Sequence, residues 1–98
     1  MTDSAAVTNN ATAGRYELEV DGSLAIAAYE RREGAIVFTH TEVPEQLEGR
    51  GIASRLIKGA LADVRDSGLK VVPLCAFVAG YIDRHPEEQD LLASGAPG

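Results

Sequence analysis

Two glycines one residue apart, Gly49 and Gly51, form the part of this chain with the clearest chemical potential. They directly precede a segment whose apolar residues recur at helical spacing, namely Ile52, Ala53, Leu56, Ile57, Ala60, Leu61 and Val64. The unpaired N–H groups at the start of a helix, together with the positive end of its dipole, attract phosphate groups. The loop therefore predicts a site for a phosphorylated ligand, and a plain strand-to-helix turn is the alternative.

The two common nucleotide-binding motifs are absent from this loop. A Rossmann loop needs a third glycine where this chain has Ser54, and an acidic residue at the end of the next strand. A Walker loop needs a longer spacing between its glycines and then a lysine followed by serine or threonine, and the chain has neither.

His40 and Glu42 are candidates for a catalytic base. They are two residues apart in an expected strand, and so would share one face. Either could take the proton of an amine that attacks an acyl group. His40 is the first choice because histidine changes its charge near neutral pH, whereas Glu42 would need desolvation to be an effective base. The alternative is that His40 packs beside Phe38 as a core residue.

Cys75, which follows an apolar strand, is a third candidate. It could act as a nucleophile that takes an acyl group if a neighbouring group lowered its pKa. An inert or pocket-lining residue is the alternative, since free cysteines are usually buried and behave as small hydrophobic residues.

The elements that must position these groups are three strands, a helix, a strand and a terminal helical segment. Residues 16–20 and 24–28 alternate around an Asp-Gly turn and predict a hairpin. Residues 35–43 predict a central strand that ends before Pro44, with Ile36, Phe38, His40 and Glu42 on one face and Val37, Thr39, Thr41 and Val43 on the other.

The helix is expected to close at Ser67 and Gly68. Residues 70–74 then predict a buried strand, which a right-handed crossover would place parallel to the third strand. The expected fold is an α/β single compact domain with a mixed, mostly antiparallel sheet, one long helix and a short C-terminal helical segment. The domain should span residues 14–92, between disordered tails at residues 1–13 and 93–98.

Composition narrows the class of protein. A formal charge of −6 disfavours nucleic acid as a partner, because a basic surface supplies most of that affinity. No apolar run approaches the length of a membrane span. The single cysteine excludes an internal disulfide and a paired-cysteine zinc site. We therefore expect a cytoplasmic monomer with no metal, no nucleic acid and no membrane as partners.

Three motifs in order resemble the GNAT N-acetyltransferase family, and its small stand-alone branch in particular. The first is Gln46-x-x-Gly49-x-Gly51, which resembles the Gln/Arg-x-x-Gly-x-Gly/Ala signature of that family. The others are residues 38–43 before the loop and residues 73–77 with 81–87 after the helix. The resemblance implies that the loop amides hold the pyrophosphate of acetyl-coenzyme A, while its pantetheine arm inserts between two strands that splay apart.

The resemblance also implies the reaction, which is direct transfer of acetyl to an amine of a small molecule or of a protein. Tyr81 would protonate the departing thiolate, and the alternative is that its ring caps the core. Arg84 or His85 would meet the phosphates, and the alternative is that they end a helix whose C-terminus favours cations. The predicted cofactor site comprises Val43, Gln46, Glu48, Gly49, Arg50, Gly51, Ile52, Ala53, Arg55, Arg84 and His85, and the predicted catalytic residues are His40, Glu42, Cys75 and Tyr81. The elements expected here do not include the N-terminal helices that usually form the acceptor site in that family. A coenzyme A-binding or partner-interaction module with little or no activity is therefore the alternative function.

Overall fold

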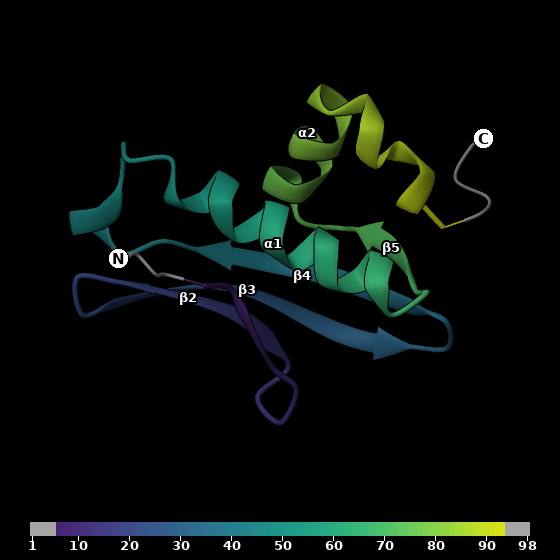
Figure 1. Ribbon diagram of the computed structural model, residues 1–98, viewed down its shortest axis with the longest axis horizontal. Coiled ribbons are helices and arrows are strands. Elements are labelled where there is room, and N and C mark those ends of the chain that lie inside the picture. Colours follow the sequence, from purple (N-terminus) through teal and green to yellow (C-terminus); the bar gives the residue numbers. More distant parts are fainter. Residues whose placement is uncertain (1–5, 94–98) are drawn as a thin grey trace.

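The computed structural model describes residues 6–93, which form a five-stranded sheet in the order β1-β2-β3-β4-β5 (Figure 1). Its strands are β1 (Thr8–Asn10), β2 (Arg15–Val20), β3 (Ser23–Arg32), β4 (Ala35–Glu42) and β5 (Lys70–Pro73). The helices are α1 (Ile52–Asp66) and α2 (Ala76–Arg84), with 3-10 turns at Glu45–Leu47 and Pro86–Leu91. β1 to β4 are antiparallel, and β5 is parallel to β4. The expected fold class is confirmed.

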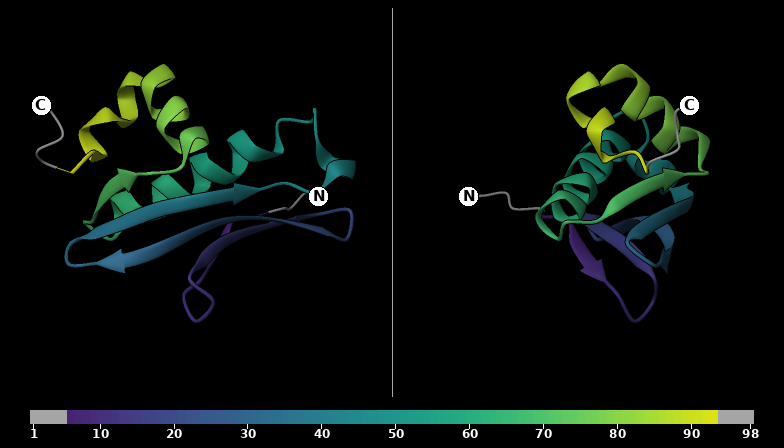
Figure 2. Two further views of the ribbon diagram at one scale, coloured as in Figure 1. Left: turned by 180° about the vertical axis from the view of Figure 1, so that it is seen from behind. Right: turned by 90° about the vertical axis from the view of Figure 1, so that its right-hand side faces the viewer.

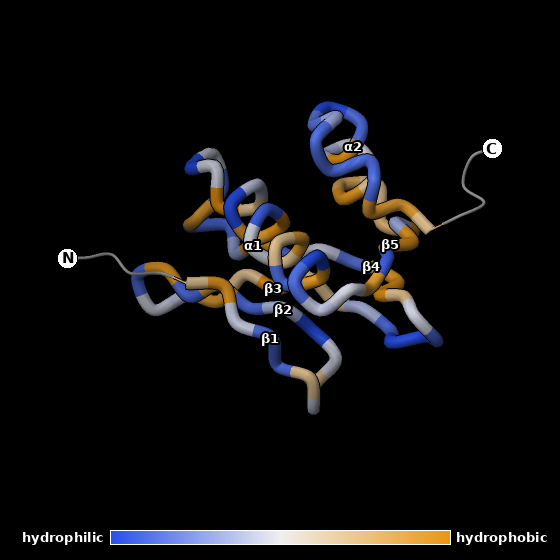
Figure 3. The backbone as a smooth tube through the Cα atoms, turned by 45° about the vertical axis from the view of Figure 1, so that its right-hand side comes forward, coloured by the Kyte–Doolittle hydropathy of each residue, from blue (hydrophilic) through white to orange (hydrophobic). Residues whose placement is uncertain are grey.

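Helix α1 lies along one face of the sheet (Figures 1 and 2). Hydrophobic and hydrophilic residues alternate along it (Figure 3), as in a helix with one buried face. Its buried side chains are those of Ile52, Leu56, Ile57, Ala60, Leu61 and Val64. They share one core with Ala25, Ala27 and Phe38 of the sheet, and with Val78 and Tyr81 of α2. The sequence pattern thus identified the buried face of α1 correctly.

Strand β4 contains an irregularity that the sequence analysis did not anticipate. Tyr29 pairs with Phe38, but Ala28 pairs with His40, so that Thr39 is an extra residue on β4. Such a β-bulge reverses the alternation of side chains beyond it. The predicted face of Phe38 therefore does not continue to His40 and Glu42. Thr41, opposite the buried Ala27, takes the face toward α1 instead.

The N-terminal segment is part of the fold from residue 8, contrary to the expected tail at residues 1–13. Thr8–Asn10 form β1, which pairs with β2. Just before it, Val7 packs against α1 at Gly59, where a methyl carbon would lie 2.5 Å from Val7 Cγ2. Glycine at this position therefore allows the close approach. Residues 1–5 lie outside the described residues.

At the other end, the backbone N–H of Ala93 donates to the carbonyl oxygen of Val71 in β5, at 3.0 Å. Residue 93 is thus attached to the sheet, whereas residues 94–98 of the expected C-terminal tail lie outside the described residues. Within residues 6–93, no helix is both long enough and apolar enough to cross a membrane.

Candidate functional site

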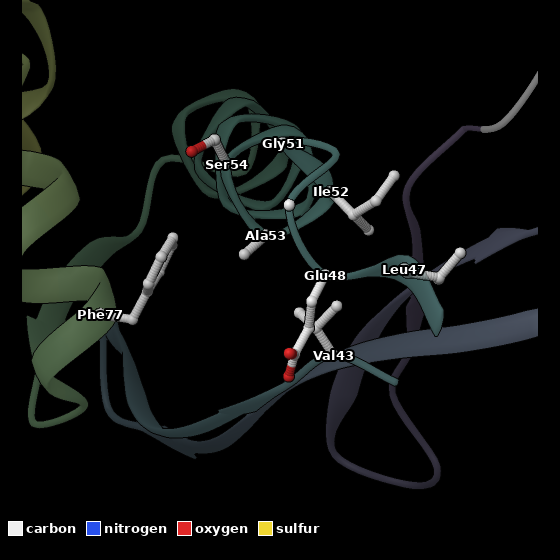
Figure 4. A pocket seen from close by; sticks show the side chains of 9 residues that line it. Val43, Leu47, Glu48, Gly51, Ile52, Ala53, Ser54 and Phe77 are labelled. Atoms are coloured by element: carbon white, nitrogen blue, oxygen red, sulfur yellow. The ribbon is translucent and has the colours of Figure 1, made fainter. Parts of the chain in front are cut away.

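A groove of about 270 Å³ lies where the glycine loop meets the first turn of α1 (Figure 4). The loop, α1 and the start of α2 all contribute to its lining, which consists of Val43, Leu47, Glu48, Gly49, Gly51, Ile52, Ala53, Ser54 and Phe77. In Figure 4, Phe77 stands across the hollow from Ala53, and the Glu48 carboxylate points away from Gly51. We call this hollow the loop groove.

The backbone at the start of α1 is suited to an anion. Gly51 is the N-cap in a left-handed conformation, with φ 72°, and its carbonyl oxygen accepts the N–H of Arg55 at 3.1 Å. The N–H groups of the first turn precede this bond and have no partner within the helix. The first turn holds no acidic residue, and no side chain caps it. The positive end of α1 therefore faces the loop groove without a neutralising charge.

A second hollow of about 220 Å³ adjoins the loop groove, with Ser54 lining both. Its other lining residues are Arg55, Lys58, Tyr81, His85, Glu87 and Glu88. The rings of Tyr81 and His85 stack at 3.9 Å, and burial raises the pKa of Tyr81, with smaller contributions from the two glutamates. The hollow thus combines two cations, two carboxylates and a stacked aromatic pair.

Strands β4 and β5 separate beside the loop groove. β4 pairs with β5 only from Ala35 to Phe38, but it pairs with β3 as far as Glu42. The carbonyl oxygen of Phe38 accepts the N–H groups of both Leu74 and Cys75 at 3.0 Å, and this ends the contact. Residues 39–42 therefore pair with no residue of β5, although Thr41 contacts Cys75 just beyond that strand. Two strands thus separate beside the glycine loop, as the family resemblance implies.

Cys75 lies at this separation, as the N-cap of α2. Its Sγ is 3.3 Å from the hydroxyl oxygen of Thr41. Burial of the thiol raises its pKa, but this is outweighed by hydrogen bonding from the Thr41 hydroxyl and from the N–H groups of Val78, Phe77 and Thr41, so the pKa is lowered overall. The thiolate is thus easier to form than in an ordinary cysteine, which is the condition for a reactive thiol.

His40 and Glu42 share a face as predicted, with Nε2 and Oε2 at 3.7 Å. Because of the bulge at Thr39, this face is the one turned away from α1. The two side chains are 61% and 70% exposed. His40 is therefore not packed beside Phe38, and Glu42 lacks the desolvation that an effective carboxylate base requires.

The remaining predicted site residues divide into four groups. Val43, Glu48, Gly49, Gly51, Ile52 and Ala53 line the loop groove, whereas Arg55, Tyr81 and His85 line the second hollow. Gln46 and Arg50 turn toward the β2–β3 hairpin, where Gln46 donates to the Ser23 hydroxyl and Arg50 pairs with Asp21 at 3.0 Å. Arg84 lies beside Gly80 and lines neither hollow.

The sequence analysis missed four residues, namely Leu47, Ser54 and Phe77 in the loop groove and Thr41 beside Cys75. Leu47 and Ser54 could have been found as neighbours of the glycines in the chain. Phe77 and Thr41 carry no local signal, because α2 and the bulge in β4 bring them to the site. Within residues 6–93, no cluster of histidine, cysteine and acidic side chains is arranged to hold a metal ion.

Comparison with known proteins relates this geometry to a family. A sequence model of the GCN5-related N-acetyl-transferase family matches residues 15–91. The solution structure of a GCN5-like protein from Staphylococcus aureus superposes with a TM-score of 0.69, covering 89% of this chain and 86% of that one, at 22% identity. This likeness supports the fold.

Among curated proteins, the chain is similar to Protein NATD1 of several vertebrates. It is 42% identical to the Gallus gallus protein over 52 residues, which are 53% of this chain and 47% of that protein. The Danio rerio protein is 31% identical over 80 residues, which are 79% of this chain and 73% of that protein. In the first of these matches, the chain spans about half the length of its relative.

Proposed function

The chain belongs to the GCN5-related N-acetyltransferase family. We propose that it binds acetyl-coenzyme A and transfers the acetyl group to an amine. The observation that carries the proposal is the uncompensated N-terminus of α1 at the loop groove, beside the separated strands β4 and β5. The diphosphate of coenzyme A would contact the N-terminus of α1, and the amide-containing arm that follows it would extend between the separated strands.

The described residues fit each part of this ligand. The pyrophosphate would accept N–H groups of the loop and of the first turn of α1. Arg55 and Lys58 in the second hollow supply positive charge for the phosphate of the adenosine portion, and the Tyr81–His85 pair supplies an aromatic surface. The unpaired side of β4 at residues 39–42 offers backbone groups to the amides of the pantetheine arm. We therefore place Tyr81 on the adenosine side rather than beside the leaving thiolate.

The reaction proposed is direct transfer. The nitrogen of a neutral amine bonds to the acetyl carbonyl carbon, the carbon–sulfur bond breaks, and coenzyme A leaves as a thiolate. The amine gives up its proton to a base. We assign this proton to His40, whose Nε2 lies 3.7 Å from Oε2 of Glu42 on the exposed face of β4.

Cys75 offers a covalent route to the same product, because its lowered pKa and its place at the separated strands favour attack by the thiolate. The acetyl group would pass first to Sγ with loss of coenzyme A, and then to the amine with regeneration of the thiol.

One observation favours the alternative of a coenzyme A-binding module without activity. The side chains that line the loop groove are apolar except for those of Glu48 and Ser54, and both candidate bases are exposed outside it.

The test begins with calorimetric titration of coenzyme A, followed by acetylation assays of a panel of amines and peptides. Direct transfer predicts that His40→Ala lowers the rate by about 10²-fold or more with nearly unchanged affinity for coenzyme A. The exposed Glu30→Gln, on the same sheet, is the matched control. Loss of activity in Cys75→Ala, with an isolable acetyl-Cys75 that acetylates an amine, would establish the covalent route instead.

Binding of coenzyme A without transfer to any amine would support the binding module. Failure of coenzyme A to bind at millimolar concentration would refute the proposed function as a whole.

A further inference from the structure

A separate cavity of about 430 Å³ lies near the C-terminal half of α1, between this helix and strands β1 to β3. It is lined by Asn9, Ala11, Tyr16, Tyr29, Arg31, Ile36, Asp63, Ser67 and Leu69, and we call it the tyrosine cavity. Its volume is within the range of about 300–1,000 Å³ that is usual for small-molecule sites. Asp63 lies about 16 Å along the helix from Ile52, at about 1.5 Å per residue. The tyrosine cavity is thus distinct from the loop groove.

Two opposite charges line the tyrosine cavity without pairing. Asp63 comes from α1 and Arg31 from β3. Among residues 6–93, no ion pair joins them, and the Arg31 guanidinium has no hydrogen-bond partner. Asp63 is held in place because its Oδ2 accepts the hydroxyl of the buried Tyr16 at 2.7 Å. A guanidinium and a carboxylate therefore face one hollow and are both available to a ligand.

The rest of the lining provides an aromatic and aliphatic surface. The Tyr16 and Tyr29 rings lie 5.2 Å apart. The Tyr29 hydroxyl donates to the side chain of Asn9, which holds β1 beside the cavity. Ile36 and Leu69 contribute aliphatic side chains. A lining with both charges and an apolar surface favours a ligand that carries both charges and an aliphatic body.

We propose that the tyrosine cavity binds a free α-amino acid with an aliphatic side chain. Arg31 pairs with the carboxylate of the ligand, in the forked geometry that guanidinium favours. Asp63 accepts its ammonium group, and the aliphatic side chain lies against Ile36 and Leu69. A ligand with a single charge would leave either Arg31 or Asp63 unpaired and desolvated, which is unfavourable.

The test is a titration of the full ¹⁵N-labelled chain followed by NMR, with L-leucine as the probe. Its two matched analogues are 4-methylpentanoate, which lacks the amine, and 3-methylbutan-1-amine, which lacks the carboxylate. We expect saturable shifts of the amide signals of Tyr16 and Ser67 with L-leucine and little change at Gly51. Each analogue should bind at least about tenfold more weakly, since one charged hydrogen bond contributes about 1.5–3 kcal/mol.

Three variants locate the charges. Arg31→Gln and Asp63→Asn should each weaken L-leucine binding at least about tenfold, and Asn at position 63 still accepts the Tyr16 hydroxyl. Arg32→Gln is the control, because it removes the same charge from the adjacent residue, which pairs with Glu30 instead.

The absence of saturable shifts at millimolar L-leucine would overturn the proposal. So would equal affinity for either analogue, or an equal loss in Arg32→Gln. If Asp63→Asn unfolds, the affinity of Arg31→Gln for L-leucine still tests the proposal, because Arg31 is exposed and its replacement should leave the fold intact. None of these outcomes depends on coenzyme A.

Discussion

Replacement of Gly51 by glutamate tests the anion site at the start of α1. No atom lies within 4 Å of the position that a Cβ would take, so that the side chain meets no steric obstacle. The left-handed φ of 72° would cost about 1–2 kcal/mol for an L-residue. A carboxylate near a helix N-terminus returns about 0.3–1 kcal/mol of this. We therefore expect a folded variant that is less stable by about 1 kcal/mol, or about 4–8 °C in Tm.

The effect on coenzyme A binding should be much larger. A ligand at one hundred times its Kd stabilises a protein by about 2.7 kcal/mol, which corresponds to a rise in Tm of about 10–20 °C for a domain of this size. The glutamate carboxylate would occupy the pyrophosphate position and repel it, so the rise should be absent in Gly51→Glu. Thermal unfolding with and without coenzyme A measures both quantities.

The matched control is Gly68→Glu, at the opposite end of α1. Gly68 also has a left-handed φ, of 73°, and open space around its Cβ position. This variant should be more destabilised than Gly51→Glu, because a carboxylate is unfavourable at the C-terminus of a helix, and yet keep the full rise in Tm. A full rise in Gly51→Glu, or an equal loss in both variants, would refute the assignment of the pyrophosphate to the N-terminus of α1.

Three further predictions concern the surroundings of the site. Thr41→Val removes a hydroxyl that lowers the Cys75 pKa, so the midpoint of alkylation by iodoacetamide should move to higher pH; an unchanged midpoint would exclude this role. Gly59→Ala should speed hydrogen exchange in β1 because the methyl group displaces Val7, while a gain of about 1 kcal/mol in helix propensity limits the change in Tm. Unaltered exchange would contradict the close approach. Hydrogen bonds from Arg65 hold the pKa of Asp90 below its ordinary value of 3.8. The pair therefore stabilises the fold at pH values above 3.8, and this stabilisation is lost as the pH falls through the Asp90 pKa. Arg65→Gln should therefore lower Tm at neutral pH, with a difference from the wild type that becomes smaller in acid, where the hydrogen bond from Arg65 to the Glu87 carbonyl oxygen is retained. A constant difference would count against the pair.

Most of the strands and helices could be predicted from the residue pattern, because the signals that specify them are local. The Asp-Gly turn specified the β2–β3 hairpin, and the helical spacing of apolar residues specified α1 and its buried face. A short apolar strand after a helix also implied the parallel pairing of β4 with β5, since crossovers of this kind are right-handed. The glycine loop was also placed correctly at the start of α1, because the glycines and the helical spacing after them are local signals.

The face of the sheet to which each side chain of β4 points depends on contacts outside that strand. The bulge at Thr39 results from the pairing of β4 with β3, and the residue pattern contains no signal for it. The bulge turns His40 and Glu42 away from α1 and brings Thr41 to Cys75. In the same way, Thr8–Asn10 has no apolar alternation, and β1 forms because β2 offers an edge to pair with and Gly59 allows Val7 to pack on α1. Local patterns specify the elements that carry such a pattern, whereas contacts between residues far apart in the chain allow β1 to form and decide which side chains meet.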